Sequence, residues 1–268
     1  MFIETADSTR LAVDVWGTGR PVVLVHAWGL SSHMWNAQLP AFLDAGLQVI
    51  TFDHRGHGRS DRPADGYDLD TMAADLITVL DELDVRDAAV VGQSMGGTVV
   101  AHAVGGIGSE RVTDVVLSAP ITPCLTVGDD NQLGLPAEAF AANRAALAAD
   151  IGAWLTANSV GYWGVGDDRF PHDTAWTLRS IYETPLPVLL ATNAAITSAD
   201  LREEIAAIDV PVLVVQGDAD LSAPIEITGQ PTATLAAKGR LEVIAGAGHG
   251  LYTSYAAAWN AAVLAAIG

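Results

Sequence analysis

Short apolar runs rich in valine recur along the chain and alternate with amphipathic stretches. The length of these runs and their content of β-branched residues are typical of buried strands. Residues 69–83 carry apolar side chains at three- and four-residue spacing with acids on the opposite face, which predicts a crossover helix. Strands that alternate with helices predict an α/β protein with a mostly parallel sheet, helices on both faces and functional chemistry at the carboxyl ends of the strands. The predicted strands are 21–26, 48–52, 88–92, 112–118, 211–217 and 241–244.

The alternation stops between residues 121 and 205, where Pro and Gly residues punctuate Ala-rich helical patches. We interpret 121–205 as a helical cap inserted into a core made of residues 1–120 and 206–268. A cap over a sheet edge has one face on the core and another over the pocket, so we expect some of its aromatic residues to line an apolar substrate site. These aromatics are Phe140, Trp154, Tyr162, Trp163, Phe170, Trp176 and Tyr182.

A serine flanked by glycines stands between an apolar strand and a helix rich in Ala and Val. The pattern Gly92-x-Ser94-x-Gly96 is typical of a sharp strand-to-helix turn that holds the serine in strained geometry, with its hydroxyl above the sheet. The flanking positions must be glycine because a Cβ would clash there. The Met95 amide, at the helix N-terminus, points to where an oxyanion would form. A plain Gly-rich turn is the alternative, but this setting favours Ser94 as a nucleophile.

A serine hydroxyl needs a base that removes its proton, and the base needs an acid that orients it. The predicted strand 211–217 runs into a turn that carries Asp218 and Asp220, and the strand 241–244 runs into a glycine loop that carries His249. We predict His249 as the general base, and because small residues surround it, we expect a mobile, exposed imidazole. The acid is one of the two aspartates.

Two other histidines have a spacing that can suit zinc. His54 and His57 are separated by two residues, but neither a thiol nor a third ligand accompanies them in the sequence. We interpret their segment as a Gly-rich loop in which Asp53 and Arg55 hold neighbouring turns. No motif in the chain implies a metal or an organic cofactor.

The order of Ser94, an acid and His249, together with several short motifs, resembles the α/β-hydrolase superfamily. More narrowly, the chain is similar to the cofactor-free haloperoxidase-like aryl esterases. The resemblance runs along nearly the whole chain and is weakest over 122–199, where substrate choice resides. The motifs are HAWG at 26–29, FDHRGHGRSD at 52–61, GQSMGG at 92–97, GDADLSAP at 217–224 and GAGHGL at 246–251.

The resemblance implies roles for further residues. In the acid loop of these enzymes the acid lies three residues past a glycine, which selects Asp220 and leaves Asp218 to fix the turn by bonding local amides. The fold takes its second oxyanion amide from the loop that begins at His26, which makes Trp28 the counterpart of Met95. We expect His26 to brace this loop through hydrogen bonds.

Two departures from the family pattern bear on the reaction. Ala27 stands where the family usually has glycine, a small change that should leave the loop amide in place. Gly29 stands where family members competent in perhydrolysis carry proline, and the resemblance ties the carbonyl placement of that proline to the use of hydrogen peroxide. We therefore expect hydrolysis rather than perhydrolysis.

Charge and composition exclude several classes of partner. The 13 basic and 32 acidic residues give a formal net charge of −19, which repels nucleic-acid phosphates and anionic lipid surfaces. No apolar stretch approaches the ~20 residues that a transmembrane helix needs. The first residues carry an acid where a secretory signal needs positive charge before an apolar core, so we expect a cytoplasmic protein. Cys124 is the only cysteine, which rules out an intrachain disulfide and favours a buried thiol.

We therefore predict a carboxylic ester hydrolase that attacks a neutral, small to medium-sized aryl or alkyl ester and passes through an acyl-enzyme on Ser94. Lactone hydrolysis uses the same triad and stays open, as does perhydrolysis of the cofactor-free haloperoxidase type. Haloalkane dehalogenases and epoxide hydrolases need Asp at this position and are excluded. A non-catalytic ligand-binding protein of the same fold is a further alternative. The expected partner is a small-molecule ester or lactone, and the sequence leaves a homo-oligomer open.

Overall fold

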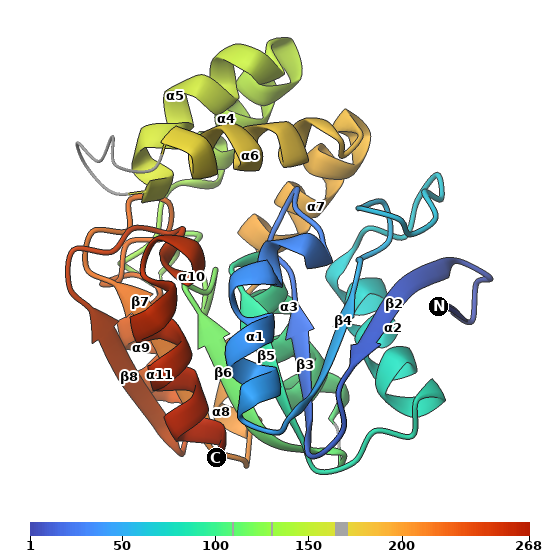
Figure 1. Cartoon of the computed structure of the whole chain (residues 1–268). Coiled ribbons are helices and arrows are strands. Elements are labelled where there is room, and N and C mark those ends of the chain that lie inside the picture. The colour runs from blue at the N-terminus through green and yellow to red at the C-terminus, as the bar shows by residue number, and fades with distance from the viewer. Residues whose placement is uncertain (109, 130, 164–170) are drawn as a thin grey trace.

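The computed structural model describes residues 1–108, 110–129, 131–163 and 171–268. Its strands form an eight-stranded sheet in the order β1-β2-β4-β3-β5-β6-β7-β8 (Figure 1). β2 pairs antiparallel with β1 and β4, whereas the other neighbours are parallel. The predicted mostly parallel sheet is confirmed. The strands are β1 (Phe2–Glu4), β2 (Arg10–Trp16), β3 (Pro21–Val25), β4 (Gln48–Phe52), β5 (Ala88–Gln93), β6 (Val112–Ser118), β7 (Val212–Gly217) and β8 (Gly239–Ile244).

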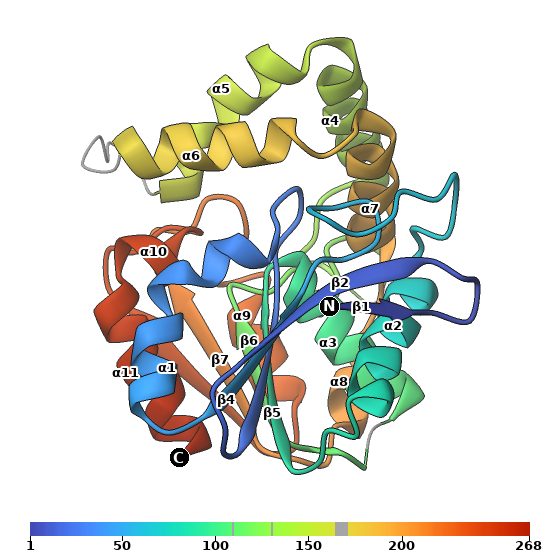
Figure 2. The ribbon, with the colours of Figure 1, turned by 45° about the vertical axis from the view of Figure 1, so that its right-hand side comes forward.

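Helices cover both faces of the sheet because its central strands are apolar on both sides. In β3, Val23 and Val25 belong to one apolar cluster with residues of α2, α3, α8 and α9, whereas Val22 and Leu24 belong to a second cluster with residues of η1, α1 and α11. Figures 1 and 2 show α1 and α11 side by side on one face. The helices of the two faces and the short segments beside them are η1 (Ser32–Ala37), α1 (Leu39–Asp44), α2 (Leu69–Glu82), α3 (Met95–His102), η2 (Ala103–Ile107), α8 (Arg202–Ala207), α9 (Gly229–Leu235), α10 (Leu251–Ser254) and α11 (Ala256–Ile267).

The structure differs from the predicted strands at both edges of the sheet. The sequence pattern misses β1 and β2, because β1 is only three residues long and charged residues interrupt the apolar run of β2. The prediction that 241–244 is a buried strand is wrong in part. β8 has a partner on one side only, so Glu242 and Val243 are exposed and Ile244 is buried. Strands at the edges of the sheet, and β2 next to one edge, therefore lack the continuous apolar signal that reveals the central ones.

Helix α2 confirms the predicted crossover helix, with one difference. Its Asp75 is 2% exposed, and Arg55 donates to it from Nε at 2.7 Å. Arg55 also donates to Asp7, in the turn between β1 and β2, at 2.8 Å. The expectation that the acids of this helix lie on the solvent face is wrong for Asp75, because a buried guanidinium compensates its charge. The expectation that Arg55 holds neighbouring turns is confirmed.

Between β6 and β7 the chain leaves the sheet and forms a group of helices. Figures 1 and 2 show these helices over the carboxyl ends of the parallel strands. We refer to these helices as the cap, and the division of the chain into 121–205 and the remainder stays a prediction. The helices are α4 (Ala137–Ala149), α5 (Ile151–Trp163), α6 (Pro171–Tyr182) and α7 (Leu186–Ser198).

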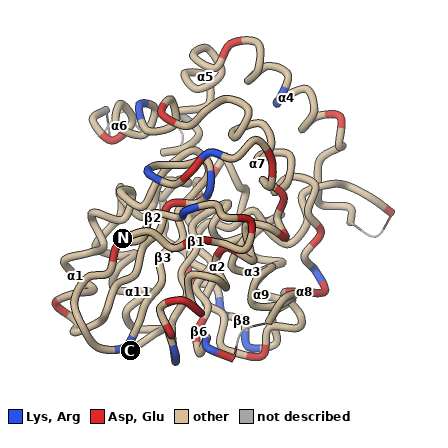
Figure 3. The backbone as a smooth tube through the Cα atoms, turned by 90° about the vertical axis from the view of Figure 1, so that its right-hand side faces the viewer, with Lys and Arg blue, Asp and Glu red and all other residues tan. Residues whose placement is uncertain are grey.

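Acidic positions outnumber basic ones along the trace (Figure 3). Some of the arginines are already neutralised, such as Arg10 by Asp61 at 2.9 Å and Arg111 by Asp81 at 2.8 Å. The remaining acids give the molecule a negative field. In the part of the chain that the structure describes, no helix has both the length and the apolar character that crossing a membrane requires.

Candidate active site

Ser94 stands at the turn between β5 and α3. Its φ is 54°, in the left-handed region that residues with a side chain rarely adopt, and its amide donates to the Ser118 carbonyl at 2.9 Å. Close packing explains the flanking glycines. A Cβ on Gly92 would lie 2.3 Å from the Gly96 oxygen, and a Cβ on Gly96 would lie 2.2 Å from the Val25 oxygen. The predicted strand–turn–helix setting of Ser94 is therefore present.

Asp220 and His249 are joined by a hydrogen bond. His249 Nδ1 donates to Asp220 Oδ2 at 2.8 Å. Asp220 follows β7 and His249 follows β8, so the parallel pairing of these strands brings the two loops together. The other carboxylate oxygen accepts the amides of Ser222 and Ala223 at 2.9 and 2.8 Å, which satisfies a side chain that is fully buried. In this tautomer Nε2 of His249 carries no proton and is able to accept one.

Asp218 is exposed and has a different partner. Its Oδ1 accepts the amide of Gly246 at 2.6 Å, in the loop that also carries His249. The expectation that Asp218 bonds local amides is wrong, because the loops after β7 and β8 lie side by side and its carboxylate reaches across. Of the two candidate acids, the one bonded to the histidine is Asp220.

The imidazole of His249 is buried, and the expectation of an exposed ring is wrong. Only 4% of the residue is exposed, because Tyr162 of α5 covers it with ring centroids 5.3 Å apart in a T-shaped arrangement. The Tyr162 carbonyl accepts the Gly250 amide at 2.9 Å, and its hydroxyl lies 3.1 Å from that of Tyr252. Burial raises the pKa of Tyr162 well above its usual value. No local pattern signals that the cap reaches the histidine loop.

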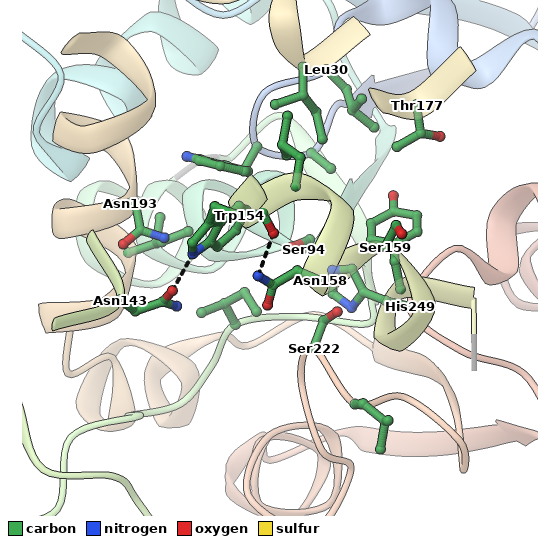
Figure 4. A pocket seen from close by; sticks show the side chains of 18 of the residues that line it. Leu30, Ser94, Asn143, Trp154, Asn158, Ser159, Thr177, Asn193, Ser222 and His249 are labelled. Carbon is green, nitrogen blue, oxygen red and sulfur yellow. Dashed lines mark hydrogen bonds between the residues drawn. The ribbon is translucent and has the colours of Figure 1, made fainter. Parts of the chain in front are cut away.

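A cavity of about 350 Å³ lies between the cap and the carboxyl ends of the strands. Figure 4 shows Ser94 and His249 on its wall. None of the hydrogen bonds among the described residues joins the Ser94 hydroxyl to the His249 ring. The described residues that line the cavity include no Asp, Glu, Lys or Arg. The described wall of the cavity thus combines a serine and a histidine with neutral side chains.

The aromatic residues of the cap divide between the cavity and the surface. The expectation that some of them line the site is confirmed for Phe140, Trp154, Tyr162 and Trp163. Trp176 and Tyr182 are exposed on α6. Phe170 lies outside the described residues. Trp28 joins the aromatic wall from the core, with its ring centroid 5.8 Å from that of Trp154.

Two backbone amides beside Ser94 are free to bind an anionic oxygen. In the described part of the chain, neither the Trp28 amide nor the Met95 amide donates to another protein group. Met95 is the first residue of α3 and follows Ser94 directly, and Trp28 lines the same cavity. The Trp28 indole is fixed because its Nε1 donates to the Leu189 carbonyl of α7 at 3.0 Å. These amides are suited to stabilise an oxyanion formed at Ser94.

Gly29 gives the loop after β3 its shape. Its φ is 70°, which proline cannot adopt because its ring holds φ near about −65°. The Gly29 amide donates to His57 Nε2 at 3.3 Å, and its carbonyl accepts the Thr184 hydroxyl at 3.2 Å. A Cβ here would lie 3.1 Å from Ile181 of the cap. The loop is therefore held from the core on one side and from the cap on the other.

Three buried histidines lie behind this loop. His26 Nδ1 donates to the Ala27 carbonyl and its Nε2 accepts the His54 amide, both at 2.8 Å, so His26 braces the loop as expected. The ring centroid of His26 lies 4.5 Å from that of His54 and 5.2 Å from that of His57. Burial lowers the pKa of all three rings, to about 3 in His57. The three rings are therefore neutral at pH 7.

The mostly parallel sheet, the serine at the turn after β5 and the acid–histidine pair after β7 and β8 are the features of an α/β hydrolase. The family model for the alpha/beta hydrolase fold matches residues 20–253, and the chain belongs to this family. This confirms the fold class expected from the motifs.

Relatives of known class agree with this assignment. The chain is 34% identical to a non-heme haloperoxidase of Rhodococcus erythropolis, over 99% of this chain and 98% of that protein. It is 31% identical to the bifunctional esterase/perhydrolase DCH of Acinetobacter calcoaceticus, over 99% of each. It matches the solved structure of an esterase from Exiguobacterium antarcticum with a TM-score of 0.93 at 26% identity, over 99% of this chain and 98% of that one. The expected resemblance to haloperoxidase-like esterases is confirmed.

Proposed function

We propose that this protein hydrolyses a neutral carboxylic ester through an acyl-enzyme on Ser94, with His249 as general base and Asp220 as the acid that orients it. The observation that carries the proposal is the 2.8 Å bond between His249 Nδ1 and Asp220, at a cavity whose wall also holds Ser94. This bond leaves His249 Nε2 as the acceptor for the serine proton. The hydrogen bond between serine and histidine in such sites often forms fully only when substrate binds.

The reaction runs in two halves. First, His249 Nε2 takes the proton of Ser94 as Oγ attacks the ester carbonyl, and the amides of Trp28 and Met95 stabilise the tetrahedral oxyanion. His249 then gives the proton to the departing alcohol. Second, a water molecule gives a proton to His249 and attacks the acyl carbonyl. His249 then returns this proton to Ser94 Oγ, which releases the acid and restores Ser94.

The cavity supports a neutral substrate of small to medium size. Its volume of about 350 Å³ accommodates esters and lactones alike. The absence of charged residues among the described lining disfavours anionic and cationic substrates. The ring walls formed by Trp28 and Trp154 suit an aromatic or alkyl group. Esters and lactones of this kind are both within the proposal.

Perhydrolysis is the second candidate, because a relative that matches along almost its full length is named a bifunctional esterase/perhydrolase. Gly29 favours hydrolysis, since its φ of 70° is incompatible with the proline that the resemblance ties to peroxide use, and Thr184 occupies its carbonyl. An assay with acetate, hydrogen peroxide and bromide measures the competing reaction. Halogenation that matched the rate of ester hydrolysis would reverse the preference.

The replacement Ser94→Ala tests the proposal. We expect turnover of p-nitrophenyl acyl esters to fall at least about 10³-fold, because the nucleophile is lost while the cavity and the free amides remain. The matched control is Ser159→Ala, which removes another hydroxyl from the cavity wall and should leave turnover within a few-fold of wild type. Circular dichroism checks that both variants are folded. Undiminished turnover in folded Ser94→Ala protein would overturn the proposal.

A further inference from the structure

Three asparagines from three helices of the cap line the cavity. They are Asn143 of α4, Asn158 of α5 and Asn193 of α7. Two of them have a visible structural task, since Asn143 Oδ1 accepts the indole N–H of Trp154 and Asn158 Nδ2 donates to the Trp154 carbonyl at 2.7 Å. Figure 4 shows these two bonds on either side of the tryptophan. Asn143 therefore fixes the indole of Trp154, and Asn158 is bonded to the backbone of its own helix.

Asn193 has no such task. Its carboxamide makes no hydrogen bond with any other described residue, although the residue is half-buried and lines the cavity. Figure 4 places Asn193 and His249 on opposite sides of Ser94. Its backbone is fixed, because its carbonyl accepts the Thr197 hydroxyl at 2.8 Å within α7. A carboxamide that extends from a fixed backbone, is partly removed from water and lacks a protein partner is suited to bind a polar group of a ligand.

The chemistry of that group follows from the surroundings. A carboxamide offers two N–H donors and one carbonyl acceptor and carries no charge. The described cavity wall contains no Asp, Glu, Lys or Arg, so a charged ligand group would be buried without compensation. A neutral group that donates and accepts at once is the best match. A second carboxamide meets this requirement, because two amides can pair edge to edge.

We propose that Asn193 recognises an uncharged amide in the acyl chain of the substrate, so that the preferred esters carry an amide on the side of Ser94 away from His249. The proposal rests on the proposed ester hydrolysis and adds the substrate class. Esters with a purely aliphatic acyl chain leave the Asn193 carboxamide unpaired on binding. The protein should therefore discriminate against these esters in favour of those that carry a matched amide.

The test compares esters that differ only in this unit. p-Nitrophenyl N-acetyl-β-alaninate carries –NH–CO– where p-nitrophenyl hexanoate carries –CH2–CH2–, and a pair one methylene longer, 4-acetamidobutyrate against heptanoate, covers a second distance from the ester. In wild type we expect the ratio of kcat/KM for the amide ester to kcat/KM for the alkyl ester to exceed the ratio in Asn193→Leu by about tenfold. Equal ratios in both proteins for both pairs would overturn the proposal.

Control variants separate polarity from shape. Ile196→Leu alters the same wall without changing its polarity, and we expect it to change both esters in the same proportion. Asn193→Ala removes the carboxamide without adding a charge, so the ratio should fall here as well, and this variant replaces Asn193→Leu if the latter does not fold. A preserved ratio in folded Asn193→Ala would also contradict the proposal.

A binding measurement distinguishes failure of this inference from failure of the proposed hydrolysis. Calorimetry on Ser94→Ala protein gives dissociation constants for the same ester pairs without turnover. An amide preference in binding that disappears when Asn193→Leu is added to Ser94→Ala supports amide recognition. This holds even if the wild-type protein hydrolyses neither ester, and then only the proposal of ester hydrolysis fails. Equal affinity for both members of each pair contradicts amide recognition, whatever the turnover.

Discussion

Asp218 and Asp220 are chemically alike and two residues apart, but their surroundings differ. The Asp220 side chain is fully buried and accepts His249 Nδ1 together with two backbone amides. Asp218 is exposed and accepts one backbone amide of the neighbouring loop. Since burial strengthens the interaction between a carboxylate and an imidazolium, Asp220 rather than Asp218 is placed to stabilise the positive charge that the proposed mechanism forms on His249.

Asp220→Asn should therefore lower kcat for ester hydrolysis by about 10³- to 10⁴-fold, because a neutral amide can hold His249 in the wrong tautomer and cannot stabilise the imidazolium. Asp218→Asn is the matched control and should stay within about tenfold of wild type, since it changes a loop contact only. Steady-state kinetics on a p-nitrophenyl ester measures both. A larger loss of kcat in Asp218→Asn than in Asp220→Asn would show that Asp218, rather than Asp220, is the acid that orients His249.

The unit formed by β5, the turn and α3 owes its shape to backbone contacts that leave no room for side chains. Gly96 packs against the end of β3, where a Cβ would lie 2.2 Å from the Val25 carbonyl. At Gly97 the nearest atom to a Cβ, the Gly92 oxygen, lies 3.2 Å away. The strained φ of 54° at Ser94 persists because these contacts hold both sides of the turn.

Gly96→Ala should lower the free energy of unfolding by about 2–3 kcal/mol, because the new methyl group must push α3 away from β3. Gly97→Ala should cost clearly less, since its neighbours need to move by only a few tenths of an ångström. Urea unfolding followed by circular dichroism gives both values. Equal destabilisation by the two variants would show that general crowding, rather than the contact with β3, governs this turn.

The buried histidines make the stability of the molecule depend on pH. Burial holds the pKa of His57 at about 3 and lowers the pKa of His26 and His54, whereas in the unfolded chain each ring titrates near its ordinary value of about 6.5. Below pH 6.5 the unfolded state therefore takes up protons that the folded state excludes. The stability that these neutral rings contribute is fully present above pH 6.5 and is lost progressively as the pH falls towards 3.

The variant His57→Gln removes one of the three buried rings that take up a proton on unfolding. A glutamine keeps a donor and an acceptor for the Gly29 loop but does not titrate. Between pH 6 and pH 4 we expect the free energy of unfolding of wild type to fall more steeply than that of His57→Gln, by up to ~1.4 kcal/mol per pH unit for the one proton. Urea unfolding at several pH values measures the slopes.

The comparison between wild type and His57→Gln cancels the effect of the net charge of −19, which both proteins share closely. Parallel slopes would mean that His57 is protonated in the folded state as well.

Much of the fold and of the candidate site was predictable because each part has a local pattern. Ser94 lies in a glycine-flanked turn, and His249 follows a strand in a glycine loop, so chain order and strand ends already point to both. The choice of Asp220 over Asp218 needed the resemblance to the family. The edge strand β1 and its neighbour β2 were not predictable in this way, because short or half-exposed strands lack a continuous apolar run.

The sequence by itself determined the central strands of the sheet, the turn at Ser94 and the loops that carry the acid and the histidine, because these depend on periodicity and backbone geometry over a few residues. Only the tertiary structure decided what surrounds them. Tyr162 covers His249, Thr184 binds Gly29, and Asn193 enters the cavity from α7. These contacts join positions far apart in the chain, and their energy depends on how cap and core pack together, which no short pattern of residues encodes.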